Sequence, residues 1–142
     1  MRLGIGILAT ILFANVALAN PECEVHDKSF KSFLSRFTED QVFQETRLVL
    51  PLVWRAGDYL TVDASVELWT LDKIKKLDYP LIYSSKQLKE ERLVQSFPIM
   101  QPGRYAEVYQ ENAGEADSVR VLAHFRNIEG CWFLEEVDDR GL

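Results

Sequence analysis

The side chains of this chain that are suited to proton transfer are few. His124 lies in a segment of alternating apolar and polar residues, and Glu107, Glu135 and Asp138 lie in the segments on either side of it. A neutral imidazole beside a carboxylate is able to act as a general acid or base near neutral pH. A histidine and a carboxylate in one chain are expected by chance, however, and their positions in the sequence do not show that they meet. We therefore assign no catalytic residue and favour a protein that is not an enzyme.

The common sequence motifs of catalysis and metal binding do not occur in the chain. It contains no Gly-x-Ser-x-Gly, no phosphate-binding loop and no His-Glu-x-x-His. Its two cysteines are not arranged as Cys-x-x-Cys, and His26 and His124 stand alone, so the ligand spacing of a metal site is missing. We expect neither a metal nor another cofactor.

Three aromatic side chains and His124 are candidates for ligand binding. Tyr105 and Tyr109 share one face of a predicted strand, His124 lies on the next predicted strand, and Trp132 lies on the last one. If the four converge beside a cavity, they would hold a small ligand by ring stacking and a few hydrogen bonds. The alternative is that the aromatic rings belong to the core and that His124 faces water, as polar faces of antiparallel strands usually do.

The first residues have the three-part pattern of a secretory signal peptide. Met1-Arg2 form a basic start, residues 3–18 are an apolar run without charge, and Ala17 and Ala19 are the small residues that signal peptidase accepts. The apolar run is shorter than the roughly 20 residues that span a bilayer. We therefore predict a signal peptide over residues 1–19 and a product that is periplasmic or secreted, with no membrane segment after its removal.

Cys23 and Cys131 are the only cysteines in the sequence. An exported compartment permits disulfides and an even count favours pairing, so we predict a bond between them. The bond would tie the start of the mature chain to the last strand. It would close a loop of about 100 residues, which is worth about 4–5 kcal/mol on the chain-entropy model. Two buried free thiols are the alternative.

Composition restricts the classes of partner. The chain has 142 residues, is 47% hydrophobic and 27% charged, and has 7 Gly and 5 Pro, which excludes disordered and low-complexity classes. Its 22 acidic residues outnumber its 16 lysines and arginines, so we exclude nucleic acid and anionic lipid surfaces as main partners. The acidic stretch at residues 135–139 is either a solvated tail or a docking site for a basic protein.

The mature chain begins with a predicted helix. Its apolar residues recur at the helical period, as Phe30, Phe33, Leu34 and Phe37. Thr38 is predicted to cap a second short helix, with Gln41 completing a capping box. A predicted strand follows over residues 48–54, and Pro51 restricts it to a sheet edge or a bulge because proline donates no backbone hydrogen bond.

The middle of the chain has weaker signals. Residues 59–62 form a short predicted strand. The next predicted helix has an apolar face made of Leu68, Leu71 and Ile74. Ser84 and Ser85 are suited to cap a further helix over residues 86–93, and residues 97–103 form a proline-rich link.

The C-terminal third predicts an antiparallel meander. Apolar and polar residues alternate over residues 105–109, 119–126 and 131–137, and turn residues separate these segments at 112–114 and 127–130. Helices therefore come first and an antiparallel sheet comes last. We predict an α+β fold in which N-terminal helices pack on one face of a curved antiparallel sheet, as a single domain over residues 20–142.

Several short motifs carry a resemblance to a known family. They are a helix with Phe30-x-x-Phe33-Leu34-x-x-Phe37, then Asp40-x-x-Phe43-Gln44-x-x-Arg47, then a strand with Leu50-Pro51-Leu52. With Trp69 and the closing residues 132–139, they resemble a family of uncharacterised secreted bacterial domains. That family belongs to the nuclear-transport-factor-2-like superfamily, a cystatin-like cone of curved antiparallel sheet around helices. The resemblance implies this fold but no activity.

The superfamily includes enzymes such as ketosteroid isomerase and scytalone dehydratase, which place catalytic groups in the mouth of the cone. No such motif matches the present sequence position by position. We therefore expect a non-catalytic, exported binding domain of the bacterial envelope or periplasm, whose partner is a protein or a small apolar ligand.

Two alternative functions make different structural predictions. An inhibitor or immunity protein that binds a basic protein needs an exposed acidic or aromatic patch. A small hydratase- or isomerase-like enzyme needs a deep, partly polar cavity that contains His124 or a buried acid.

Overall fold

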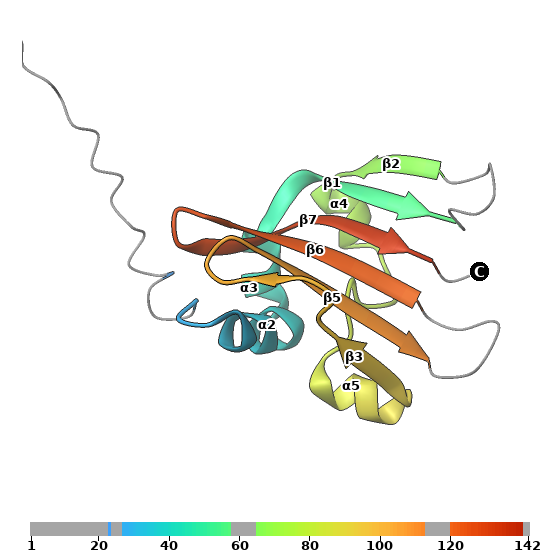
Figure 1. The fold of residues 1–142 in the computed structure, drawn as a ribbon. Helices are drawn as coiled ribbons and strands as arrows, with labels where there is room; N and C mark the ends of the chain where they lie inside the picture. The colour runs from blue at the N-terminus through green and yellow to red at the C-terminus, as the bar shows by residue number, and fades with distance from the viewer. Residues whose placement is uncertain (1–22, 24–26, 58–64, 113–119, 141–142) are drawn as a thin grey trace, which may run out of the picture.

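The computed structural model describes Cys23 and residues 27–57, 65–112 and 120–140 (Figure 1). The predicted signal peptide, the predicted strand over residues 59–62 and part of the predicted turn at 112–114 lie outside the described residues. Within the described residues, no helix is both long enough and apolar enough to cross a membrane.

The first long helix, α2 (Phe30–Glu39), confirms the predicted apolar face. Its N-cap is Ser29, whose hydroxyl accepts a hydrogen bond from the backbone N–H of Ser32. The residues that it buries are Phe30, Phe33, Leu34 and Phe37. These positions recur at the helical period, so a single stripe of the helix faces the sheet.

The short helix α3 (Gln41–Thr46) begins two residues later than predicted. Its N-cap is Asp40, whose carboxylate accepts a hydrogen bond of 3.0 Å from the backbone N–H of Phe43. Thr38 lies inside α2, and its hydroxyl donates to the carbonyl oxygen of Leu34. The prediction that Thr38 is the cap is therefore wrong, because α2 continues past it and the Asp40 carboxylate is the acceptor at the next helix start.

The strands form one curved, unclosed sheet in the order β2-β1-β7-β6-β5-β3, with β4 also paired to β5 (Figure 1). Their bounds are β1 Leu48–Ala56, β2 Ser65–Trp69, β3 Leu93–Ser96, β4 Met100–Gln101, β5 Tyr105–Asn112, β6 Arg120–Ile128 and β7 Cys131–Asp139. The predicted meander of β5, β6 and β7 is confirmed, since both pairs are antiparallel.

The sheet is mixed rather than wholly antiparallel, because β1 runs parallel to β7. A parallel pair requires a long connection, and most of the chain lies between these two strands. Pro51 lies in β1, which has neighbours on both sides, and the pairing of β1 with β7 shifts register between Leu48 and Val53. The bulge alternative for Pro51 is therefore the correct one.

The middle of the chain differs most from the prediction. Leu68 lies in β2 and is exposed, and the helix that follows, α4, contains only Leu71–Ile74. β2 is held by its pairing with β1, where Trp69 lies opposite Leu52. The helix α5 (Ser85–Glu90) has the predicted cap at Ser84, but it ends before Leu93, which begins β3.

The core lies between α2 and the sheet. The ring of Phe125 in β6 lies among the rings of α2, with centroid distances of 5.3 Å to Phe30, 5.7 Å to Phe33 and 5.4 Å to Phe37. Edge-to-face aromatic packing of this kind adds to the stabilisation from burial alone. The predicted α+β packing of N-terminal helices on one face of the sheet is confirmed.

A disulfide joins Cys23 to Cys131, as predicted, so the alternative of two free thiols is contradicted. The bond fixes the segment before α2 to the start of β7. Asp27 adds a second attachment, because its carboxylate accepts a hydrogen bond of 2.8 Å from the backbone N–H of Trp132. The two sulfur atoms are bonded to each other and are not available as a pair of metal-binding thiolates.

Candidate binding site

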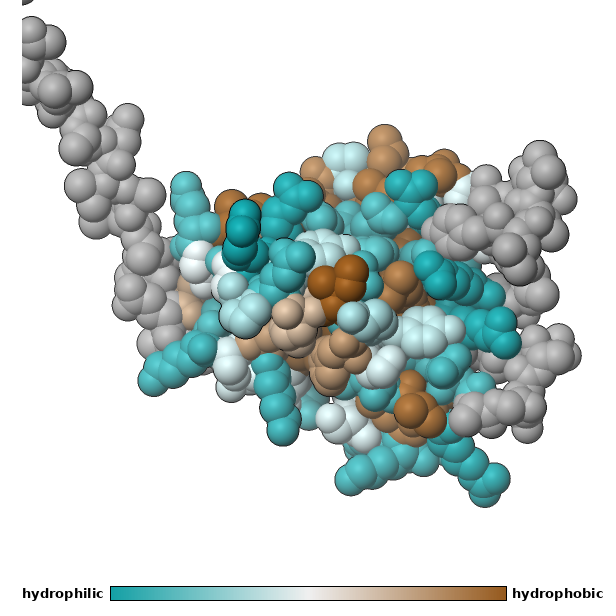
Figure 2. Space-filling view, viewed as in Figure 1, coloured by the Kyte–Doolittle hydropathy of each residue, from teal (hydrophilic) through white to brown (hydrophobic). Residues whose placement is uncertain are grey.

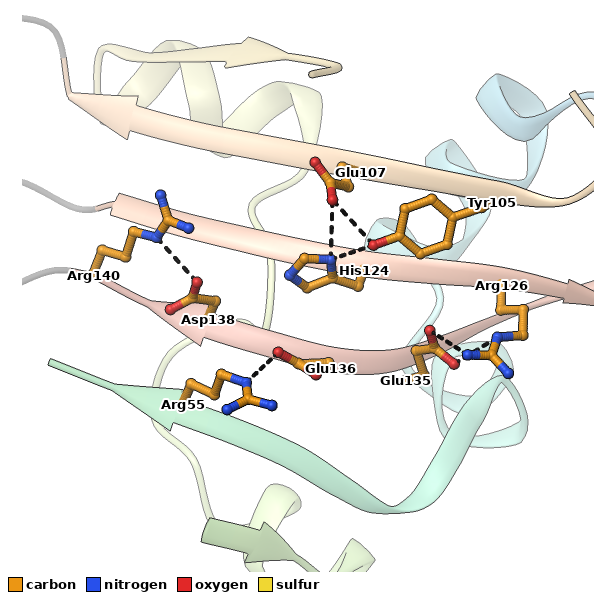
Figure 3. Close-up of polar contacts among 9 residues, drawn as sticks. All are labelled: Arg55, Tyr105, Glu107, His124, Arg126, Glu135, Glu136, Asp138 and Arg140. Carbon is orange, nitrogen blue, oxygen red and sulfur yellow. Dashed lines mark hydrogen bonds and ion pairs between the residues drawn. The ribbon is translucent and has the colours of Figure 1, made fainter. Parts of the chain in front are cut away.

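The face of the sheet that points away from α2 carries a cluster of Tyr105, Glu107 and His124 (Figure 3). The Tyr105 hydroxyl oxygen lies 2.5 Å from Nδ1 of His124 and 3.1 Å from Oε1 of Glu107. The same carboxylate oxygen lies 3.4 Å from Nδ1. Strand register explains the cluster, since Glu107 in β5 lies directly opposite His124 in β6. Adjacent positions on the same sheet face therefore bring the three groups together.

Tyr105 has one hydroxyl proton, so it donates only one hydrogen bond to its two neighbours, Glu107 and His124. Burial, followed by the hydrogen bond to Glu107, raises the pKa of the Tyr105 phenol above its usual value, so the phenol stays protonated at neutral pH. When that proton is donated to Glu107, the contact with His124 requires a proton on Nδ1. Nε2 of the neutral imidazole is then the acceptor nitrogen.

The carboxylates of the acidic stretch are paired with arginines on this polar face (Figure 3). Glu135 and Arg126 lie 2.9 Å apart, Asp138 and Arg140 lie 3.0 Å apart, and Glu136 pairs with Arg55 of β1. The stretch belongs to β7 and is not a solvated tail. Its negative charge is largely balanced within the protein.

The four sequence-predicted ligand residues do not all meet. Tyr105 and His124 contact each other, and Tyr109 lies on the same face, opposite Leu122 of β6. Trp132 lies on the other face, where it is buried with its ring centroid 4.9 Å from that of Phe30.

A bulge in β7 sets the face of Trp132. His124 pairs with Glu136, but the next residue, Phe125, pairs with Leu134, so Glu135 is the extra residue. One inserted residue moves each side chain that precedes it in the strand to the opposite face of the sheet. Trp132 therefore points into the core with Leu134.

We consider three cavities, none of which is lined by His124, Tyr109 or Trp132. The first, of about 300 Å³, adjoins Tyr105 and includes the side chains of Arg104 and Arg126. The second, of about 320 Å³, lies beside α3 and has Lys75 and several carboxylates in its lining. The third is the most apolar of the three.

The third cavity, of about 340 Å³, lies between α2 and the segment that joins β3 to β4, and we call it the α2 groove. The α2 side of the groove consists of Phe30, Lys31, Leu34, Ser35 and Thr38. The buried stripe of α2 forms its apolar floor, and the next stripe around the helix forms its rim. The groove therefore runs along the edge of the buried stripe that contains Phe30 and Leu34.

The opposite wall of the α2 groove comes from Tyr83, Ser85, Gln95, Phe97 and Met100. Phe97 and Met100 are each 43% exposed, which is high for large apolar side chains. The Phe97 ring packs edge-on against Phe30 with centroids 6.3 Å apart. Figure 2 shows apolar atoms at the surface where the β3–β4 segment passes between the α2 and α5 regions. The wall is therefore apolar and open to solvent.

A buried glutamine holds this wall in place. Gln110 of β5 is fully buried, accepts a hydrogen bond from the backbone N–H of Tyr83 and donates to its carbonyl oxygen, at 2.7 and 2.8 Å. It also donates to the side-chain oxygen of Gln95 at 2.8 Å. Three bonds from one side chain attach the segment before α5 to the sheet and to β3.

No motif in the sequence marks the residues of the α2 groove as a site. The sequence pattern predicts a link over residues 97–103, which contains Phe97 and Met100, and Gln110 lies just beyond the predicted strand over residues 105–109. Two signals were present: large apolar residues at positions 97, 99 and 100 of a predicted link, and a glutamine at an inward strand position after Ala106 and Val108.

Comparison with known proteins identifies the fold. No protein-family model and no curated protein matches the chain. The crystal structure of an NTF2-like protein from Bacteroides fragilis is similar, with a TM-score of 0.57 and 15% sequence identity. The match covers 80% of this chain and 47% of that chain, so this chain spans about half the length of that protein. The likeness shows that the chain has the nuclear-transport-factor-2-like fold that the sequence motifs implied.

Proposed function

We propose that this protein is an exported, non-catalytic binding domain that holds a small apolar ligand in the α2 groove. The observation that carries the proposal is the pairing of an apolar cavity of about 340 Å³ with an exposed apolar wall, Phe97 and Met100. Ligand sites commonly have volumes of about 300–1,000 Å³ and mostly apolar linings with a few polar groups. Water in such a groove is displaced favourably by an apolar ligand.

Export is supported by the disulfide and by the signal-like start of the sequence. Disulfides persist in secreted and periplasmic proteins and are rare in the cytosol. The bond between Cys23 and Cys131 joins residues far apart in the chain, so it is a structural bond rather than a local motif. Membership of a family of secreted bacterial domains is part of the same proposal.

The absence of catalysis is supported by the position of His124. The imidazole contacts Tyr105 and Glu107 on the polar face, and the α2 groove lies on the other side of the sheet. The inhibitor alternative receives less support, because Glu135, Glu136 and Asp138 are already paired with arginines. A basic partner would have to compete with these internal pairs.

The proposal is tested with N-phenyl-1-naphthylamine, an uncharged probe whose fluorescence rises in apolar surroundings. We expect saturable binding to the disulfide-bonded protein. Phe97→Ser should weaken this binding about tenfold or more, since burying a phenylalanine side chain contributes about 1.5–3 kcal/mol.

Ile128→Ser is the matched control, because Ile128 is also 43% exposed but lies at the β6–β7 turn. It should leave probe binding unchanged. Circular dichroism confirms that each variant is folded. No binding to the unsubstituted protein, or an equal loss in both variants, contradicts the proposed function.

A further inference from the structure

We infer that the α2 groove selects a single-chain amphiphile with an anionic head, whose apolar chain lies in the groove and whose head contacts the ammonium group of Lys31. This inference rests on the proposed function and names the chemical class of its ligand. The inference follows from the distribution of charge around the groove, from the lack of an ion pair at Lys31 within the described residues, and from the size of the cavity.

The charge of the groove is opposite to that of the chain as a whole. Acidic residues outnumber lysines and arginines by 22 to 16 in the sequence. Among the residues that the structure describes, the groove lining nevertheless contains one charged residue, Lys31, and no carboxylate. The first turn of α2, which contains Lys31, also has no acidic residue, although carboxylates are favoured at that position of a helix. A negative head therefore meets no like charge among the described residues of the groove.

Lys31 has no ion pair with any residue that the structure describes, whereas other lysines of the protein do. In the cavity beside α3, for example, Lys75 contacts the carboxylate of Glu45 at 3.0 Å. Lys31 is exposed, so its ammonium group remains hydrated without a ligand. Its methylene groups are able to lie along the groove while the ammonium group stays in water. This is the arrangement that an amphiphile needs at the point where its chain meets its head.

The other polar groups of the groove are neutral, and some are already occupied. The Thr38 hydroxyl donates to backbone carbonyl oxygens within α2, and the Gln95 side-chain oxygen accepts from Gln110. These neutral side chains offer no negative charge to bind the positive group of a zwitterionic or cationic head. Lys31 is therefore the group that distinguishes one head from another.

The size of the α2 groove suits one chain. A methylene group occupies roughly the volume of a water molecule in the liquid, about 30 Å³, so a cavity of about 340 Å³ holds on the order of ten carbons. A two-chain lipid is too large to enter as a whole. The acidic surface of the protein also disfavours docking onto an anionic bilayer, and we therefore assign a free amphiphile rather than a membrane surface.

The test compares three probes with the same ten-carbon chain: decanoate, decanol and decyltrimethylammonium. Each is titrated at pH 7 and low salt, below its micelle concentration, as a competitor of N-phenyl-1-naphthylamine. Decanoate should bind at least about threefold more tightly than decanol, which is the scale of one solvent-exposed ion pair. Decyltrimethylammonium should bind most weakly. The preference for decanoate should shrink as salt is added.

Lys31→Gln should abolish the preference for decanoate while leaving decanol binding unchanged, and Lys31→Arg should restore the preference. Lys28→Gln is the matched control, because Lys28 is also exposed and precedes α2 but does not line the groove. It should retain the full preference.

The outcomes separate the inference from the proposed function. Equal binding of decanoate and decanol, or loss of the preference in Lys28→Gln, overturns the inference while groove binding stands. Failure of N-phenyl-1-naphthylamine and of all three ten-carbon probes to bind overturns the proposed function itself. Vesicles of phosphatidylglycerol are the last arm: protein that binds them but not decanoate has a membrane surface as its partner, which also overturns the inference.

Discussion

The guanidinium group of Arg47 lies against the disulfide, with its Nη1 2.9 Å from Sγ of Cys23. Its Nη2 is 3.9 Å from the carboxylate of Asp27, and both side chains are buried. Asp27 in turn accepts the backbone hydrogen bond of Trp132. Arg47, at the end of α3, therefore binds the segment before α2, and Asp27 extends the link to the start of β7 alongside the covalent bond.

Arg47→Met should destabilise the protein strongly. The substitution keeps most of the side-chain stem but removes the positive charge beside the buried Asp27 carboxylate, and such changes cost about 3–5 kcal/mol. The free energy of unfolding is measured by urea titration with the disulfide intact. The double variant Arg47→Met with Asp27→Asn should recover part of the loss, because it no longer buries an unpaired charge.

The control for Arg47→Met is Lys86→Met, which breaks the exposed pair with Glu90. That pair should contribute less than about 1 kcal/mol. Equal effects of Arg47→Met and Lys86→Met would show that the buried pair has no special importance.

Replacing both cysteines with alanine should lower the free energy of unfolding by about 4–5 kcal/mol on the chain-entropy model, because the bond closes a loop of about 100 residues. Urea titration of the double variant and of the oxidised protein measures the difference. The variant should retain the far-ultraviolet circular dichroism of the folded protein at low urea, since the core around Phe125 does not depend on the sulfur atoms. A difference below about 1 kcal/mol contradicts the prediction.

Local periodicity made α2 and the C-terminal meander predictable from the sequence. The buried positions of α2 recur within ten residues, and the strands β5 to β7 are joined in sequence order. The middle of the chain was not predictable in this way. Leu68 and Leu71 fit a helical face, but the backbone of β2 pairs with β1, and Trp69 stacks on Trp54 with ring centroids 3.9 Å apart. Contacts between distant residues overrode the local pattern.

The positions of the four predicted ligand residues followed only in part from the sequence, because they also depend on pairing between strands. Alternation predicts that Tyr105 and Tyr109 share one face of β5, but only the register between β5 and β6 puts His124 on that same face. Trp132 is on the opposite face because the bulge at Glu135 breaks that alternation. The consecutive Glu135 and Glu136 between Leu134 and Val137 are a local sign of this break in the sequence. The α2 groove depends on how the β3–β4 segment packs against α2, which is a property of the folded chain.

The Tyr105 phenol should make stability depend on alkaline pH. Its pKa is raised in the folded protein by burial and by Glu107, so the folded state keeps a proton that the unfolded state loses above about pH 10. This contribution to stability is fully present below pH 10 and falls as the pH rises towards the folded pKa. Urea titrations at pH 9, 10 and 11 should show a smaller fall for Tyr105→Phe than for the unsubstituted protein.

Glu107→Gln should reduce the same alkaline fall without removing the phenol, because it eliminates the negative charge and the hydrogen bond that raise the Tyr105 pKa. If both variants lose stability as steeply as the unsubstituted protein between pH 9 and pH 11, the Tyr105 phenol is not the group responsible.

The Asp40 cap should make stability depend on acid pH in the opposite sense. The hydrogen bond from the backbone N–H of Phe43 is the largest cause that lowers the pKa of this carboxyl in the folded protein. Its contribution is present above the unfolded value, near pH 4, and is lost as the pH falls through the lowered folded value. Asp40→Asn keeps a capping oxygen but no titrating group, so the stability difference from the unsubstituted protein should change between pH 5 and pH 2. A constant difference over that range argues against the cap as the source.

Gln110 connects the stability of the fold to the shape of the α2 groove. Gln110→Met fills a similar volume but leaves the backbone N–H and carbonyl of Tyr83 without their partner, at a cost of about 1–3 kcal/mol. The Tyr83 segment is then no longer fixed to β5, so the groove wall should loosen and the binding of N-phenyl-1-naphthylamine should weaken. Gln101→Met, at an exposed position of β4, is the matched control and should change neither quantity. Unchanged probe binding in a destabilised Gln110→Met would show that this glutamine holds the fold together but does not shape the groove.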